Sequence, residues 1–234
     1  GYDVIATSNG AFIFAGHSWS FGSKQQVYVI KTDFHGNPEW EKTYGGSNWD
    51  VGMAIKETSD GNYLIVGYTN SPGISSGNTD VYLIKIDKDG NQLWQKAHGK
   101  ESEVNHEWGN DFIELENGDF YVVGTRDYYG SYKRNILLLR VDKFGELIWE
   151  REFKTAGAVD EVGYTISHSS LGGYFICASV NSLEEPQRFN PQIIKIDDFG
   201  NIDWTRTFNA SAMYYHRFGA SSTADGGLII TGAT

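Results

Sequence analysis

The stretch Tyr82-Leu83-Ile84-Lys85-Ile86-Asp87-Lys88-Asp89-Gly90-Asn91-Gln92-Leu93-Trp94 decides the fold, because its pattern returns three more times along the chain. Each copy has an aliphatic–basic pair, then Asp-x-x-Gly, and then Trp-x-(Lys/Arg). The tryptophans Trp40, Trp94, Trp149 and Trp204 recur at intervals of 54, 55 and 55 residues. Self-similarity at a fixed period of this length is the signature of a repeat architecture.

A second marker runs through the same units: a turn pair, one further residue, and then a short apolar strand. It occurs five times, at Asn9-Gly10, Asp60-Gly61, Asn117-Gly118, Leu171-Gly172 and Asp225-Gly226. Glycine in such turns takes the positive φ that a tight hairpin requires. With no helical periodicity between the turns, each unit is predicted to form four short antiparallel strands.

Apolar residues on both faces of a unit, as in Val81 to Ile84, require a neighbour on each side. Radial stacking supplies both neighbours and hides the sheet edges. The prediction is an all-β fold, a β-propeller of four-stranded antiparallel blades with four complete blades and a partial fifth. One propeller region spans 1–234, with blades at about 1–45, 46–100, 101–155, 156–210 and 211–234. Four and a half blades cannot close a ring, so either the missing strands come from elsewhere or the chain is an excerpt of a larger propeller, and we expect the excerpt.

The Tyr82 to Trp94 motif resembles the quinoprotein-type (PQQ-like) propeller repeat, in which Gly and Trp join neighbouring blades. It is more similar still to the β-propeller repeat of secreted bacterial and archaeal surface proteins. This resemblance covers the whole chain and implies an extracellular, cell-surface or periplasmic location without one shared activity. The vicinal disulfide of quinoprotein dehydrogenases cannot form here, because Cys177 is the single cysteine. We therefore expect no cofactor.

The composition of the chain, together with incomplete matches to known sequence motifs, excludes several functional classes. The formal charge of −11, from 19 basic and 30 acidic residues, argues against a nucleic-acid partner. No apolar run reaches the ~18 residues that a transmembrane helix needs. His106-Glu107-Trp108-Gly109-Asn110 opens like a zinc-protease motif but has Asn110 where the second His belongs, and the Asp-x-x-Gly loops lack a closing Glu for calcium. No metal site is predicted.

Variable loops are concentrated on one face of the predicted propeller, because the connections between strands two and three and between successive units share one rim. Aromatic and polar side chains mix there, as suits a sugar ring or a protein partner. Several of these side chains could equally pack their own loops onto the rim. The candidate ligand-binding residues are Trp19, Trp49, His106, Trp108, Arg126, Tyr128, Tyr129, Tyr214, Tyr215 and Arg217.

An acidic residue stands two positions before the first-strand glycine in three units, as Asp50, Glu107 and Glu161. If the first strands line the axis, these carboxylates approach the channel mouth. They could hold a cation or form an acid/base pair, with Glu107 and Glu161 as that pair. The alternative is that they cap loops or pair with neighbouring basic residues.

Three functions remain in competition. The leading hypothesis is a non-catalytic binding or scaffold module of an extracellular protein, which recognises a glycan or protein partner through the variable face. The first alternative is a glycoside hydrolase or lyase that acts at the channel mouth. The second is a structural subunit of a surface assembly. On this ranking the chain is expected to be a binding protein rather than an enzyme.

Overall fold

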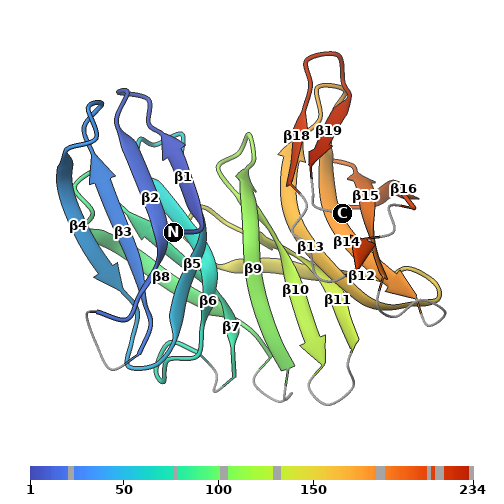
Figure 1. The fold of residues 1–234 in the computed structure, drawn as a ribbon, viewed down its shortest axis with the longest axis horizontal. Coiled ribbons are helices and arrows are strands. Elements are labelled where there is room, and N and C mark those ends of the chain that lie inside the picture. Colours follow the sequence, from blue (N-terminus) through green and yellow to red (C-terminus); the bar gives the residue numbers. More distant parts are fainter. Residues whose placement is uncertain are drawn as a thin grey trace.

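The computed structural model describes residues 1–20, 24–75, 78–100, 105–128, 133–182, 188–209, 212–213 and 219–231. Every regular element in these ranges is a β-strand, and none of these residues lies in a helix, so the predicted all-β class is confirmed. Figure 1 shows the strands as successive twisted ribbons, with β1 to β4 on one side of the molecule and β18 and β19 on the other.

The first two repeat units each form a four-stranded antiparallel sheet whose strands follow one another in chain order. The first contains β1 (Asp3–Ala6), β2 (Phe12–Ser18), β3 (Gln26–Thr32) and β4 (Pro38–Tyr44). The second contains β5 (Asp50–Glu57), β6 (Tyr63–Thr69), β7 (Asp80–Ile86) and β8 (Gln92–His98). Its first strand begins at Asp50, so Asp50 belongs to the strand itself.

The next two units are joined into one nine-stranded sheet. The third unit contains β9 (Asn105–Glu114), β10 (Phe120–Tyr128), β11 (Lys133–Val141) and β12 (Leu147–Phe153). The fourth contains β13 (Ala158–His168), β14 (Tyr174–Ser182), β15 (Arg188–Ile196) and β16 (Ile202–Thr207), and β17 (Ala212–Met213) pairs with β15. One parallel pair, Arg134 with Asp160, links the two units.

The last two strands, β18 (Gly219–Ser222) and β19 (Leu228–Thr231), form a separate hairpin. Strand pairing thus divides the described residues into four sheets, rather than the five separate units that the sequence predicts. The strand pairing of Arg134 with Asp160 joins the third and fourth units into one sheet and accounts for the lower number. Within these residues, no strand pairing joins the first sheet to the last.

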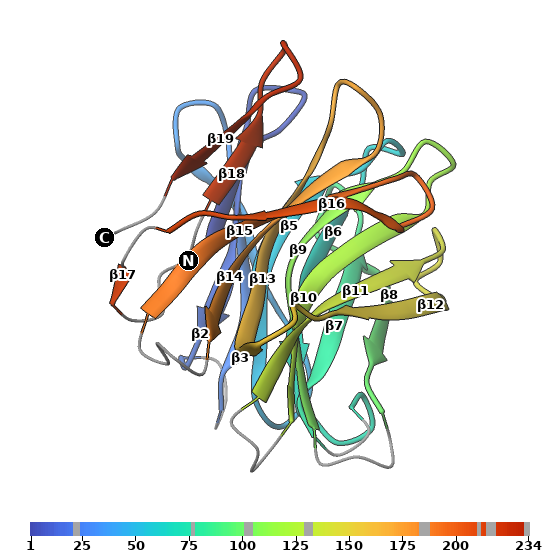
Figure 2. The ribbon, with the colours of Figure 1, turned by 90° about the vertical axis from the view of Figure 1, so that its right-hand side faces the viewer.

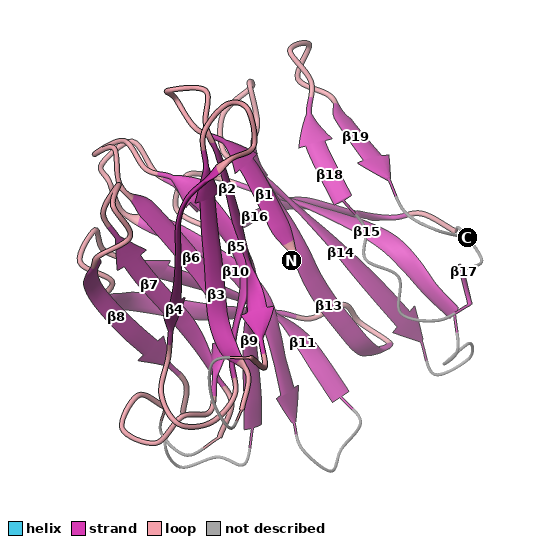
Figure 3. Ribbon diagram, turned by 60° about the vertical axis from the view of Figure 1, so that its left-hand side comes forward, coloured by secondary structure: helices cyan, strands magenta, loops and turns pink. Residues whose placement is uncertain are grey.

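The first strands of successive units lie beside one another, as contacts of β1 with β5, β5 with β9, β9 with β13 and β13 with β18 show. They therefore form the inner wall of the molecule, while the fourth strands β4, β8, β12 and β16 lie at the outer edge. Figures 2 and 3 show this stacking from two further directions. The arrangement is that of a β-propeller.

The Asp-x-x-Gly turns form as predicted. In the second unit, Asp87 Oδ1 accepts hydrogen bonds from the backbone N–H groups of Asp89 and Asn91, at 2.9 and 2.8 Å. The same two contacts recur at Asp33, Asp142 and Asp197. These carboxylates replace the backbone partners that a tight turn lacks.

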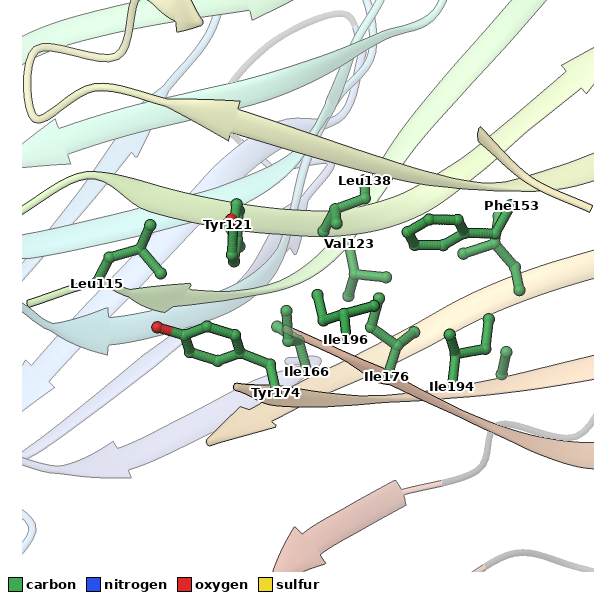
Figure 4. Packing of buried hydrophobic residues seen from close by; sticks show 12 residues of the cluster. Leu115, Tyr121, Val123, Leu138, Phe153, Ile166, Tyr174, Ile176, Ile194 and Ile196 are labelled. Atoms are coloured by element: carbon green, nitrogen blue, oxygen red, sulfur yellow. The ribbon is translucent and has the colours of Figure 1, made fainter. Parts of the chain in front are cut away.

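Hydrophobic clusters fill the spaces between units. One lies between the third and fourth units, where Tyr121 of β10 meets Tyr174 of β14 edge to face with ring centroids 5.4 Å apart (Figure 4). Trp149 of β12 packs against this cluster. Cys177 is fully buried in the cluster between β13 to β15 and the β18–β19 hairpin, as expected for a residue that fills the core.

We predict that Gly145→Ala is more destabilising than Gly36→Ala, although both glycines have a positive φ, 83° and 86°. A Cβ at Gly145 would lie 2.6 Å from a ring carbon of Trp94, whereas one at Gly36 would meet nothing within 4 Å. Both variants bear about 1–2 kcal/mol of backbone strain. Steric overlap should cost Gly145→Ala about 1–3 kcal/mol more. Urea unfolding measures the difference, and equal losses would contradict the contact.

Candidate functional site

A β-bulge interrupts the first strand of the second, third and fourth units immediately after its glycine. In the third unit Gly109 faces Gly124 and Asp111 faces Val123, so Asn110 is the extra residue. Met53 and Tyr164 are the extra residues in the second and fourth units. A bulge puts two consecutive side chains on one side of a strand and is common beside functional sites.

These bulges line a cavity of about 360 Å³ on the inner wall. The extra residues contribute to its surface, and so do the residues that follow them. The second residue after the strand glycine is the cavity position of each unit. In the first four units this residue is Asp3, Ala54, Asp111 and Thr165. Gly219 of β18 completes the wall. The cavity is therefore formed jointly by all five first strands and holds two carboxyl groups, those of Asp3 and Asp111.

Asp111 is the more enclosed of the two carboxyl groups. Its Oδ1 lies 2.6 Å from Lys56 Nζ, and its Oδ2 accepts a 3.0 Å hydrogen bond from the N–H of Ile166 in the next unit. Burial raises the pKa of the Asp111 carboxyl above its ordinary value, while Lys56 and the N–H donors oppose that shift. Lys56 also donates to Phe112 O.

Asp3 occupies the equivalent position in the first unit and bonds in the same way. Its Oδ2 accepts a 2.9 Å hydrogen bond from the N–H of Ile55, and its Oδ1 accepts one from Val4 N–H at 2.9 Å. Both carboxylates thus fasten one inner strand to the next while they border the cavity. Sequence reasoning missed them, although acids at the same offset from Gly1 and Gly109 were visible in the repeat.

The predicted channel-mouth acids lie elsewhere in the first strands and are satisfied locally. Asp50 is fully buried, and its carboxylate accepts hydrogen bonds from Gly46 N–H, Ser71 Oγ and Thr69 Oγ1. Glu161 is 1% exposed and accepts bonds from Thr155 N–H at 3.0 and 3.1 Å. Burial raises the pKa of both carboxyls. Each one closes the loop that enters its own unit.

Glu107 is satisfied differently, by a buried arginine. Arg126, 1% exposed, donates from Nε to Glu107 Oε1 at 2.7 Å, and its remaining nitrogens bond Glu150 and Glu152 at 2.9 and 2.5 Å. Burial raises the pKa of Glu107, and Arg126 opposes that shift. Arg126 therefore joins three glutamates within the third unit.

The predicted aromatic rim residues have three different environments. Trp19 and Trp49 are 57% and 46% exposed, and Lys24 Nζ lies 5.7 Å from the centroid of the Trp49 ring. His106 and Trp108 stack with ring centroids 6.2 Å apart. Tyr128 donates a 2.6 Å hydrogen bond to Glu152 Oε2, so it belongs to the arginine–glutamate cluster.

Four candidates, Tyr129, Tyr214, Tyr215 and Arg217, lie outside the described residues. Ligand binding by the rim therefore stays a prediction. Among the residues that the structure describes, no group of three His, Cys, Asp or Glu side chains is arranged to hold a metal ion. In the same ranges, no helix has the length and hydropathy to cross a membrane.

Solved structures similar to this chain share its fold. An endo-arabinase from Bacteroides thetaiotaomicron is 13% identical with a TM-score of 0.55, over 98% of this chain and 87% of that one. An α-L-arabinofuranosidase from Fusarium graminearum is 8% identical with a TM-score of 0.60, over 97% and 73%. The chain also matches a Bacteroides caccae protein of unknown function at 14% identity, with a TM-score of 0.51 over 95% of this chain, and spans 65% of that protein's length.

No family model and no curated protein matches the sequence. At these identities the structural likeness shows the propeller fold alone, and it does not single out the quinoprotein-type repeat. Both named neighbours are glycoside hydrolases, which contradicts the leading expectation of a non-catalytic binding or scaffold module. That expectation rested on the variable rim, whereas the inner strands gather carboxyl groups around a cavity. The hydrolase alternative is the better supported one.

We predict that Arg126→Leu destabilises the protein by about 3–5 kcal/mol, because it leaves Glu107 as a buried charge without its partner. Lys88→Ala is the matched control, since Lys88 and its partner Asp89 have side chains 76% and 65% exposed, and it should change stability by less than about 0.5 kcal/mol. Chemical denaturation measures both.

Adding Glu107→Gln to Arg126→Leu should restore part of the lost stability, because the buried charge is removed. If the double variant is no more stable than Arg126→Leu alone, lost packing rather than charge explains the effect.

Proposed function

We propose that this chain forms the propeller of a glycoside hydrolase whose reaction takes place in the cavity of the inner wall. This proposal is supported mainly by two carboxyl groups, those of Asp3 and Asp111, which lie on different strands around one cavity. Glycoside hydrolysis uses such a pair, one as a proton donor and one as a base or nucleophile.

Asp111 suits the role of proton donor. Burial raises its pKa, so its carboxyl keeps a proton to higher pH than an exposed aspartate does. In this role it would protonate the glycosidic oxygen as the bond to the anomeric carbon breaks. Lys56, 2.6 Å from Oδ1, sets how far the pKa rises and holds the carboxyl in place.

Asp3 then takes the second role. Its carboxylate either attacks the anomeric carbon or removes a proton from the attacking water, and the separation of the two carboxyl groups in the complex decides between these courses. Tyr2 and Tyr164 border the same cavity, where aromatic side chains suit the apolar face of a sugar ring.

The proposal extends to the substrate class, the number of blades and the location of the protein. The arabinan-related names of two neighbours point to a polysaccharide or glycoside that contains arabinose. We assign the β1–β4, β5–β8, β9–β12 and β13–β16 segments to four blades and β18–β19 to part of a fifth. An enzyme with a polymeric glycan as substrate would act outside the cell.

We predict that the wild-type chain hydrolyses arabinan or an aryl arabinofuranoside, and that Asp111→Asn and Asp3→Asn each lower kcat/KM by about 100-fold or more. The loss follows because an amide neither donates the required proton nor acts as the base. Reducing-sugar release and aryl-group absorbance are the measurements.

The matched control is Asp89→Asn, which alters an exposed turn carboxylate and should leave the rate unchanged. Unaltered thermal unfolding of the two cavity variants would separate lost catalysis from lost folding. Absence of hydrolysis by the wild-type chain across arabinose, xylose and galactose glycosides would overturn the proposed function.

We predict that the rate falls as pH rises through the pKa of Asp111, because the proton donor is then ionised. Lys56 lowers that pKa, so Lys56→Met should raise it further and move the alkaline limb of the kcat/KM profile to higher pH. A pH–rate profile of both proteins measures the shift. An unmoved or lowered limb would contradict the role of Asp111.

A further inference from the structure

One contact is repeated at each boundary between the first four units. The tryptophan of the fourth strand covers the turn glycine of the following unit, so that Trp94 lies over Gly145 and Trp149 over Gly200, where a Cβ would come within 2.6 Å of the ring. Trp40 covers Gly90 in the same way, at 3.0 Å.

A basic residue two positions after each tryptophan strengthens this contact. Lys42 Nζ donates to Asn91 Oδ1 at 2.9 Å, and Arg151 Nη1 donates to Asn201 Oδ1 at 3.0 Å. Lys96 bonds Glu146, the residue at the same turn position, at 2.5 Å. The partner is in each case the residue that follows the turn glycine.

The residue four positions after the tryptophan completes the interface. Tyr44 donates a 2.7 Å hydrogen bond to Gly90 O, and His98 Nε2 lies 2.8 Å from Gly145 O. Phe153 occupies this position in the third unit and is 6% exposed. Tryptophan, basic residue and this third side chain together form a three-part surface that recognises a glycine turn.

The fourth unit carries the same three parts as Trp204, Arg206 and Phe208. Here they are exposed: Trp204 and Phe208 are 46% and 41% accessible, and every residue of β16 is exposed. Within the described residues, no hydrogen bond or ion pair involves the Arg206 side chain. Ile202, 47% exposed, extends the apolar strip.

The β18–β19 hairpin defines where a partner would sit. Leu228 and Ile230 pack against the fourth unit's cluster, which contains Phe175 and Ile193. By order in the repeat, β19 corresponds to β6, which pairs with β5 on one side and with β7 on the other. Among the described strands, β19 pairs with β18 alone.

We propose that the strip formed by Ile202, Trp204, Arg206 and Phe208 is a docking surface for one kind of partner, a β-hairpin of the repeat's own third-and-fourth-strand type. Its first strand pairs with the edge of β19 that lies opposite β18. Its turn places a glycine beneath Trp204 and an Asn or Glu oxygen against Arg206. The proposal rests on the three boundaries between the first four units, where the equivalent side chains contact such a turn. The fourth unit presents the corresponding three side chains at its outer edge. It is independent of any catalytic activity.

The test uses a fluorescein-labelled peptide with the sequence of residues 80–98, closed across its ends by a disulfide between added cysteines. It carries the Asp87 to Asn91 turn and should bind the full chain saturably in fluorescence anisotropy. Trp204→Ala should weaken binding by roughly tenfold or more, as expected for an aromatic hot spot. Arg206→Ala should weaken it less.

Two controls are matched to the contact. Trp19→Ala removes another exposed tryptophan, on the opposite rim, and should leave binding unchanged. A peptide with Gly90→Val should not bind, because the side chain would meet the indole. Circular dichroism of each variant checks that the chain is folded.

The proposal is overturned if the peptide shows no saturable binding to the folded wild-type chain, or if Trp204→Ala binds it as tightly. It is also overturned if sedimentation shows that the chain self-associates and that Trp204→Ala abolishes this. A second copy would then be the occupant.

Discussion

The stack of sheets depends on an indole ring held over a glycine. Trp40, Trp94 and Trp149 each need a turn without a Cβ in the next unit, and that turn needs its Asp cap to present the glycine. Turn chemistry and inter-unit packing are therefore one constraint, which explains why Asp, Gly and Trp recur together at a fixed spacing. Units that share this contact repeat their orientation, and the first strands are consequently brought side by side around a common cavity.

Along the inner wall, equivalent carboxylates of successive units are alike in being buried but differ in the groups that bond them. Asp50, Glu107 and Glu161 occupy one repeat position and are all buried, yet their partners are hydroxyls, a guanidinium and a backbone N–H, respectively. Because a buried carboxylate must be satisfied, each unit has evolved its own local solution. The cavity position behaves differently, since only two units carry an acid there. Variation at that position gives the cavity its two carboxyl groups, those of Asp3 and Asp111.

Much of the fold was predictable because its determinants are local. Tryptophan spacing and the glycine turns were enough to predict four antiparallel strands in the second unit, which the structure contains as β5 to β8. The cavity was not predictable, because a bulge such as that at Asn110 is a register shift between two strands and leaves no local pattern. Asp50, Glu107 and Glu161 were chosen by their offset from the strand glycine, and the structure places them in local hydrogen bonds and ion pairs, whereas the acids that line the cavity stand two residues after that glycine. The emphasis on the variable rim then led to a non-catalytic function.

The pairing of Arg134 with Asp160 bears on how the chain unfolds. Backbone pairing and a bidentate ion pair, with nitrogen–oxygen distances of 2.6 and 2.5 Å, join the third and fourth units into one hydrogen-bonded sheet. The first and second units are separate sheets held by side-chain packing. In a linear array, cooperativity follows the strength of coupling between neighbours. Strands β9 to β16 should thus exchange their amide protons as a single block, while the two amino-terminal sheets open independently.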